Sequence, residues 1–366
     1  MILSTLIVIV VSATGGYIYL RQEKFGALPK GKRLEQIKNS PNYRNGKFHN
    51  KVKLPMIAEG YSFFDVLWTS LTKKFPRTEP SEILPSIRTN LKKLPIDKNY
   101  LVWFGHSSFL MQIDGIKILV DPVFSGNASP IPGSVKAYKG ADIYTVDDIP
   151  EIDYLLISHD HYDHLDYETI KKLNSKIKYV VCGLGVGANF EYWGYSADKI
   201  LDKDWGDEIK INNNLSIFVE STQHNCARGL ARDKALWVSY IIKTPTMQLF
   251  YSGDGGYDNR FNEIYKKYGV MDWAIMEFGQ YNPAWESVHE LPYQVIKATE
   301  ELHAKQMVPV HHSKFTLARH PWDEPLKLAT ELSQNKEYKL ATPMIGEVLW
   351  LNDTTQQFKQ WWDGIG

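Results

Sequence analysis

A short segment in the middle of the chain is dense in side chains that bind metal ions. Four ligand-type residues, His159, His161, Asp163 and His164, fall within six positions. They directly follow the apolar run 154–157, which predicts a buried strand. Side chains two positions apart on an extended backbone point the same way, as His159 and His161 would. Imidazole and carboxylate together suit Zn, Fe, Mn or Ni, so we interpret the segment as a metal site rather than a solvated loop.

The chain turns before Asp163 and His164, so these two side chains could bind a second ion close by. This segment alone has too few ligands for two ions. Three further candidates, His224, Asp254 and His311, each follow an apolar run that predicts a strand. A lone histidine more often has a structural role than a metal-binding one. Three ligand-type residues that all follow predicted strands make the metal-binding interpretation stronger. A carboxylate can bridge two cations, and Asp254 is the natural bridge. The sequence therefore predicts a two-metal site.

Other residues could support this site. Asp121 precedes a proline after another apolar run and could orient a ligand imidazole, although a turn aspartate is an equally good interpretation. Four more histidines fall on loops expected at the same face: His106, His289, His312 and His320.

The remaining pattern predicts a layered domain of mixed strands and helices, of the α/β or α+β class. Expected strands cover 101–104, 108–113, 116–120, 154–157, 178–182, 215–220, 237–242, 248–251, 273–276, 307–310 and 347–351. Expected helices cover 167–173, 260–268 and 293–302, and a helix followed by a Pro-rich loop is expected over 61–95. The two cysteines, Cys182 and Cys226, do not form a disulfide framework. The formal net charge is zero, which gives no global signal for nucleic-acid binding.

The N-terminus differs in composition from the rest. Residues 2–20 contain no charged side chain, close to the ~20 apolar residues that cross a bilayer. Residues 21–60 are basic and punctuated by Asn, Gly and Pro, which predicts a linker. We interpret 1–20 as a single-pass membrane anchor in preference to a cleaved signal peptide or a buried helix. The basic tract favours the cytoplasmic side for the hydrolase domain, residues 61–366.

The order of these ligands resembles the metallo-β-lactamase superfamily. The sequence around these ligands is similar to the N-acylphosphatidylethanolamine-hydrolysing phospholipase D family over roughly 94–351. The resembling segments are 105–108, 119–125, 157–167, 222–228, 252–257 and 310–315. The motif from His159 to His164 is specific for the superfamily, whereas 223–226 and 124–125 narrow the resemblance to the family.

The resemblance implies an α+β fold, a four-layer αββα sandwich with a di-zinc site at one edge, other divalent metals being compatible. One zinc would be held by His159, His161 and His224, and the other by Asp163, His164 and His311, with Asp254 bridging. Asp163 would orient the attacking water. His289 matches a family histidine near the phosphodiester and is a candidate acid.

The function expected from these residues is phospholipase D-type cleavage of N-acylphosphatidylethanolamine, a membrane phospholipid, to phosphatidic acid and N-acylethanolamine. Metal ligands do not separate this from a lactonase or a cyclic phosphodiesterase. A metal-binding envelope protein without catalysis also stays open. A nuclease is disfavoured, because residues 54–366 are net acidic once the basic tract is set aside. We expect no nucleic-acid partner, and a homodimer is compatible with the sequence.

Overall fold

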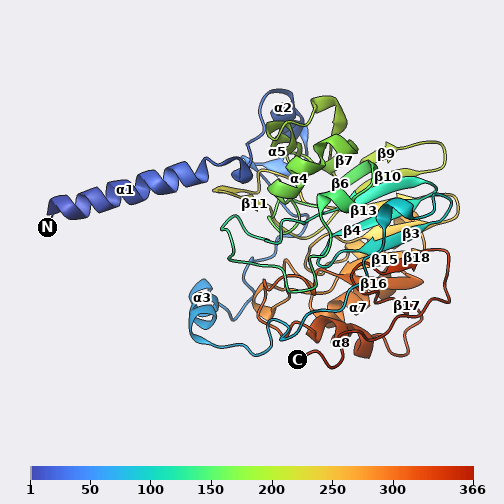
Figure 1. Ribbon diagram of the computed structural model, residues 1–366. Coiled ribbons are helices and arrows are strands. Elements are labelled where there is room, and N and C mark those ends of the chain that lie inside the picture. The colour runs from blue at the N-terminus through green and yellow to red at the C-terminus, as the bar shows by residue number, and fades with distance from the viewer. Residues whose placement is uncertain (1) are drawn as a thin grey trace.

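Two seven-stranded sheets lie face to face in the computed structural model, which describes residues 2–366 except the side chains of 2–4, 6–10, 70 and 71. Helices α4 and α5 lie on one side of the paired sheets, and α7 and α8 lie on the other (Figure 1). The predicted α+β sandwich is therefore present, with mixed parallel and antiparallel strands in both sheets.

The first sheet has the strand order β18-β3-β4-β5-β6-β7-β8. Strands β5 to β8 run parallel, and β3 has the same direction because it is antiparallel to β4, which is antiparallel to β5. The strands are β3 (Tyr100–Trp103), β4 (Phe109–Ile113), β5 (Ile116–Val120), β6 (Ile152–Ile157), β7 (Ile177–Gly183), β8 (Ile200–Lys203) and β18 (Val348–Trp350).

The second sheet has the order β17-β16-β15-β14-β13-β10-β9. Strands β10, β14, β15, β16 and β17 share one direction, so their carboxyl ends meet at one edge. The strands are β9 (Glu208–Lys210), β10 (Ser216–Ser221), β13 (Val238–Lys243), β14 (Gln248–Tyr251), β15 (Trp273–Glu277), β16 (Gln306–Val310) and β17 (Lys339–Leu340). A small ribbon, β11 (Ala227–Arg228) with β12 (Ala231–Arg232), stands apart.

Successive residues of the second sheet alternate between two apolar cores, as the two faces of a strand require. Leu249 and Ile275 pack in the large core that also contains residues of the first sheet such as Leu155. Phe250 and Ala274 point the other way, into a core shared with α6 and α7. The helices are α4 (Tyr167–Leu173), α5 (Gly187–Tyr192), α6 (Arg260–Tyr268), α7 (Pro292–Glu301) and α8 (Glu324–Leu332), with 3-10 turns η2 (Leu91–Lys93), η3 (Val146–Asp148), η4 (Asn174–Lys176), η5 (Ala197–Lys199) and η6 (Pro283–Trp285).

Residues 21–60 are not the linker that their composition predicts. They form η1 (Glu23–Phe25), α2 (Gly31–Asn39), β1 (Tyr43–Arg44) and β2 (Lys47–Phe48), and they pack on the domain. Ile37 and Phe48 are buried in the main core. The segment contacts the site directly, because Asn50 Nδ2 donates to the carbonyl of His224 at 2.8 Å. Basic composition concealed this packing, since only two apolar side chains are buried.

The N-terminal helix α1 (Ile2–Leu20) projects from the body of the domain (Figure 1). Within the part of the chain that the structure describes, no helix is long and apolar enough to cross a membrane. The membrane anchor over 1–20 is therefore not supported, and nine of its residues fall outside the described side chains.

The packing of the N-terminal segment can be tested at Arg33, whose guanidinium pairs with the buried carboxylate of Asp202. Arg33→Gln leaves that carboxylate without its cation, and we expect the free energy of unfolding to fall by about 3 kcal/mol. Chemical denaturation measures the change, with the exposed Lys32→Gln as the matched control. An unchanged stability in Arg33→Gln would restore the linker interpretation.

Candidate metal centre

The predicted ligands converge because the strands that carry them end at the same edge. His159 to His164 follow β6, and His224 follows β10. Asp254 follows β14, and His311 follows β16. Ligands gather where parallel strands end, since their carboxyl ends open on one crevice.

Three imidazole nitrogens form the first group. His161 Nδ1 lies 2.9 Å from His159 Nε2 and 3.3 Å from His224 Nε2. All three nitrogens lie within 4.8 Å of one another, which fits ligands of one ion.

Four side chains form the second group: Asp163, His164, His311 and His106. Asp163 Oδ2 lies 3.5 Å from His164 Nε2 and 2.9 Å from His106 Nε2. The rings of His106 and His311 pack against each other in a tilted arrangement, with centroids 4.1 Å apart. His106 thus joins a group that the sequence predicted with three members.

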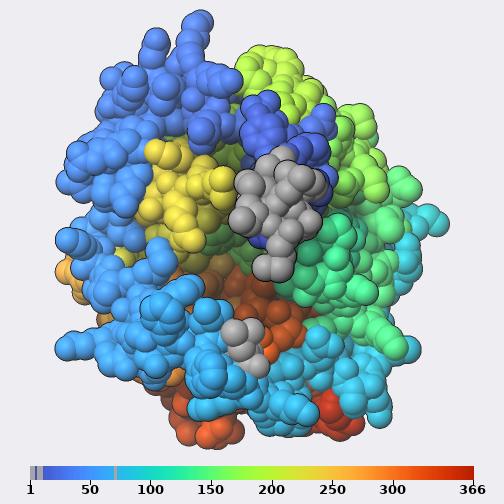
Figure 2. Space-filling view, turned by 90° about the vertical axis from the view of Figure 1, so that its left-hand side faces the viewer, coloured from blue at the N-terminus to red at the C-terminus, as the bar shows by residue number. Residues whose placement is uncertain are grey.

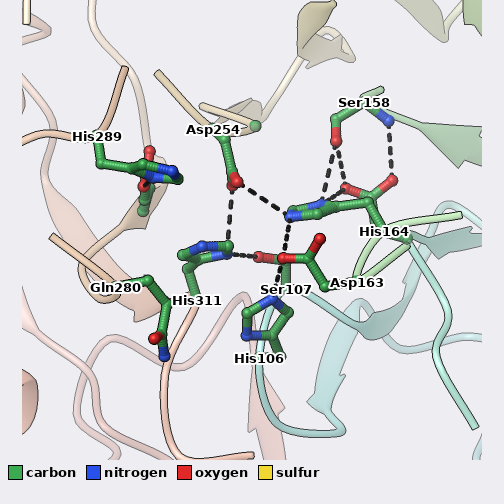
Figure 3. Close-up of polar contacts among 12 residues, drawn as sticks. His106, Ser107, Ser158, Asp163, His164, Asp254, Gln280, His289 and His311 are labelled. Atoms are coloured by element: carbon green, nitrogen blue, oxygen red, sulfur yellow. Dashed lines mark hydrogen bonds and ion pairs between the residues drawn. The ribbon is translucent and has the colours of Figure 1, made fainter. Parts of the chain in front are cut away.

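The carboxylate of Asp254 faces His164 and His311 of the second group (Figure 3), and it also lies near His159 of the first group. Its Oδ2 is 3.1 Å from His164 Nε2 and 3.9 Å from His159 Nε2, and its Oδ1 is 3.2 Å from His311 Nδ1. One carboxylate therefore faces both groups, the position that the sequence predicted for a bridge.

Two glycines allow Asp254 to occupy this position. Gly253 has a φ of +58°, and a Cβ there would lie 2.7 Å from the carbonyl of Val238. A Cβ on Gly255 would lie 2.1 Å from Thr222 Oγ1. Only glycine fits at both positions, so the turn after β14 passes close to its neighbours and directs the carboxylate inward.

The second nitrogen of most of these imidazoles is held by a neighbour. His164 Nδ1 is 2.8 Å from Asp121 Oδ2, the orienting contact that the sequence left open. Ser158 Oγ lies 2.9 Å from His159 Nδ1, and the carbonyl of Val288 lies 2.9 Å from His224 Nδ1. Such contacts fix the ring and its tautomer, which leaves the other nitrogen for a metal.

Burial sets the charge of the two groups. It lowers the pKa of His159, His161, His224 and His311, so these imidazoles are neutral near pH 7 and offer a lone pair. Burial opposes a charge on His164 too, but the carboxylates of Asp254 and Asp163 outweigh it and raise its pKa well above the usual range. A cation at the site would replace that proton, because metal ligands must be deprotonated.

The donor set fits metal ions by a separate criterion. Among the described residues, the buried atoms His164 Nε2, Asp254 Oδ1 and His311 Nε2 have no hydrogen-bond partner. Buried polar atoms are normally satisfied. Cations at this position would satisfy these atoms once His164 has lost its proton.

His289 lies beside the ligands, and it pairs with a residue that the sequence did not suggest. Its Nδ1 contacts Glu277 Oε1, and its ring packs 5.2 Å from that of His224 and 5.5 Å from that of His311. Glu277 ends β15, and its Oε2 accepts from the backbone N–H of Gly255 at 2.7 Å. The buried Glu277 carboxylate therefore holds both His289 and the turn that carries Asp254.

Two other histidines lie outside the site. His312 Nδ1 and Nε2 contact Ser313 Oγ and the carbonyl of Pro309, and His320 Nε2 accepts from the N–H of Gln280. His106 and Glu277 belong to the site without having been singled out as ligands or partners. Both follow the rule that identified the others, since His106 follows β3 and Glu277 is the last residue of β15.

Comparison with known proteins places the chain in a family. Residues 117–312, more than half of the chain, match the β-lactamase superfamily domain. The chain belongs to the metallo-β-lactamase superfamily. Igni18, a metallo hydrolase from Ignicoccus hospitalis, has the same fold, with a TM-score of 0.53, 20% identity and coverage of 72% of this chain and 100% of that one.

Two relatives align over most of the chain. An uncharacterized protein of Mycobacterium tuberculosis is 30% identical over 315 residues, 84% of either chain. The N-acyl-phosphatidylethanolamine-hydrolyzing phospholipase D 1 of Caenorhabditis elegans is 27% identical over 268 residues, 68% of this chain and 75% of that protein. Family, fold and donor set together support a metal-dependent hydrolase.

Replacing Asp254 by Asn tests its position between the groups. Asp254→Asn removes the charge that faces both groups, and we expect metal content and hydrolysis to be lost while the fold is kept. Elemental analysis, circular dichroism and turnover of a soluble diester measure this, with the exposed Asp353→Asn as control. Full metal content and activity in Asp254→Asn would show that the Asp254 carboxylate does not bridge two metal ions.

A weaker effect is expected from Asp121, which touches His164 through its carboxylate. Asp121→Asn can still accept a hydrogen bond but loses the negative charge, and we expect metal affinity to fall by about 10–100-fold. Competition with a chelator of known affinity measures the change. An affinity equal to the wild type would mean that the contact does not tune the ligand.

Proposed function

We propose that this protein is a dinuclear zinc hydrolase that cleaves N-acylphosphatidylethanolamine to phosphatidic acid and N-acylethanolamine. The single observation that carries the dinuclear part is the Asp254 carboxylate, which faces both ligand groups at 3.1 to 3.9 Å. We assign His159, His161 and His224 to one ion and Asp163, His164 and His311 to the other, with Asp254 shared between them.

The lipid part is supported by the C. elegans relative, whose name gives this activity. Membership of the superfamily alone does not identify the substrate. Lactones and cyclic phosphodiesters are therefore the competing substrates.

Two divalent cations bound here would supply an acidified water and stabilise negative charge on the phosphoryl oxygens. The chain supplies the groups around them. Asp163 uses Oδ2 for its contacts with His106 and His164, so its Oδ1 can accept a hydrogen bond from the attacking water and orient it.

His289 can protonate the departing alkoxide of the N-acylethanolamine. Burial opposes its charge, but the adjacent Glu277 carboxylate outweighs burial and raises the pKa of His289 to about 9. His289 is therefore protonated at neutral pH, with Nδ1 held by Glu277 and Nε2 left to donate. A general acid placed in this way typically contributes about 10²–10⁴-fold in rate.

Four features remain predictions: the membrane anchor over 1–20, the cytoplasmic side of the domain, the absence of a nucleic-acid partner and a homodimer. The anchor would keep the enzyme beside a bilayer substrate, because the helix α1 joins directly to a segment packed on the site. Trp193 Nε1 donates to the carbonyl of Glu23 at 2.9 Å, and Arg228 Nε donates to that of Lys24 at 3.0 Å.

The proposal is tested by turnover of a substrate panel with product identification by mass spectrometry. We expect hydrolysis of bis-p-nitrophenyl phosphate and release of N-acylethanolamine from the phospholipid, both lost with a chelator and restored by zinc. Preference for a lactone or a cyclic nucleotide would replace the lipid assignment. Bound metal without turnover of any ester would favour the non-catalytic alternative.

The role of His289 is tested through its partner. In Glu277→Gln the carboxylate is lost, so burial lowers the pKa of His289 and the ring is neutral at pH 8. We expect kcat to fall by about 10–100-fold. We also expect the alkaline limb of the pH profile to move to lower pH. The exposed Glu263→Gln is the matched control. An unshifted profile in Glu277→Gln would remove His289 as the acid.

A further inference from the structure

Helix α3 (Phe63–Thr72) buries none of its described side chains against the domain. A capping box between Ser62 and Asp65 starts it, so its first turn is stabilised locally. Phe64 is 79% exposed and Trp68 is 69% exposed, and Phe63, Leu67 and the preceding Tyr61 are exposed as well. We call these five side chains the α3 surface. Exposed aromatic side chains gathered on one helix mark an interaction site.

The chain on either side of α3 is tied to the loops that carry the site. Before the helix, the N–H of Ala58 donates to the carbonyl of Ala284 at 2.8 Å, in the loop that leads to His289. After it, the N–H of Trp322 donates to the carbonyl of Arg77 at 2.8 Å, in the loop that follows His311. The segment that carries the α3 surface is therefore held at both of its ends by loops near the candidate metal centre.

The α3 segment and a hollow lie on one face of the molecule. In Figure 1, α3 lies on the side from which α1 projects. Figure 2 shows that side: light-blue chain that includes α3 forms part of the rim of a hollow, and orange-red chain is visible inside it. The orange-red part of the chain carries the loop after His311.

Basic residues lie on both sides of the helix in the sequence. Lys73 and Lys74 follow it directly, whereas Lys53 and Lys51 come ten and twelve residues before Phe63. The two acidic residues between them are Glu59 and Asp65, and Asp65 is engaged in the helix cap. Aromatic side chains bordered by lysines match a surface with an apolar interior and anionic head groups.

We propose that the α3 surface docks into the interface of an anionic phospholipid bilayer and places the hollow over it. A bilayer fits better than a peptide, because the aromatic side chains project from a convex helix and do not line a groove. Docking by the α3 surface does not require α1 to enter the membrane. Its role in catalysis rests on the proposed function, since a membrane phospholipid must reach the metals through this hollow.

The first experiment reports on α3 alone, in the full chain. Cys182 and Cys226 are buried, so Phe64→Cys can be labelled selectively with a polarity-sensitive fluorophore. The control, Asn213→Cys, lies in the turn between β9 and β10, at the edge of the sheet opposite the site. With phosphatidylethanolamine–phosphatidylglycerol vesicles, we expect a blue shift and a several-fold rise in emission at position 64 and no change at position 213.

Three outcomes would overturn the proposal. The first is a label at position 64 that stays in water while the protein floats with vesicles, which would assign membrane binding to α1. The second is a shift that follows protein concentration without vesicles, which would assign the surface to a second copy. The third is an equal response to pure phosphatidylcholine vesicles, which would show that binding does not depend on anionic head groups.

A second experiment links docking to turnover. In Phe64→Ser we expect the rate on vesicle-borne N-acylphosphatidylethanolamine to fall about tenfold or more, from the loss of one buried aromatic side chain. Turnover of bis-p-nitrophenyl phosphate and the melting temperature should stay at wild-type values. An equal loss on both substrates would overturn the docking role. If the wild type cleaves neither substrate, the proposed function fails, whereas the label at position 64 still decides the docking.

Discussion

A buried carboxylate surrounded by imidazoles is the constraint on which the site depends. Asp254 is 2% exposed, and its oxygens face His164, His159 and His311. An uncompensated charge at such a position costs several kcal/mol. Burial also keeps most of the surrounding imidazoles neutral. Cations bound here would satisfy the carboxylate and the imidazoles together, at the edge where strands of both sheets deliver their candidate ligands.

The sequence predicted the parts of this account that follow from local pattern. Apolar runs identified the central strands, and ligand-type residues directly after them identified the seven candidate ligands, because strand ends of one direction share an edge. Pattern alone did not give the pairing of His289 with Glu277 or of Asp163 with His106. These contacts join residues 12 and 57 positions apart, so they depend on strand order. The composition of residues 21–60 wrongly predicted a linker. The segment packs on the domain through a few buried side chains, Ile37 and Phe48 among them, although most of its lysines are exposed.

Two segments outside the matched superfamily domain, residues 117–312, lie beside the candidate metal centre. The candidate ligands follow strand ends inside the matched domain, whereas these two segments come before it in the sequence. The segment after α1 packs on the ligand loop, with Phe25 against Tyr162 at a ring-centroid distance of 6.3 Å. The α3 segment is tied to the loops near His289 and His311. The proposed docking and the proposed chemistry therefore involve segments that contact the same loops.

The central proposal is that the site holds two metal ions that share Asp254. Anomalous diffraction from crystals of the full chain, recorded above and below the zinc absorption edge, tests that claim. We predict two peaks in each molecule, one among His159, His161 and His224 and one among Asp163, His164 and His311, with Asp254 in contact with both. A single peak in an active protein, or two peaks that do not share Asp254, would contradict the account.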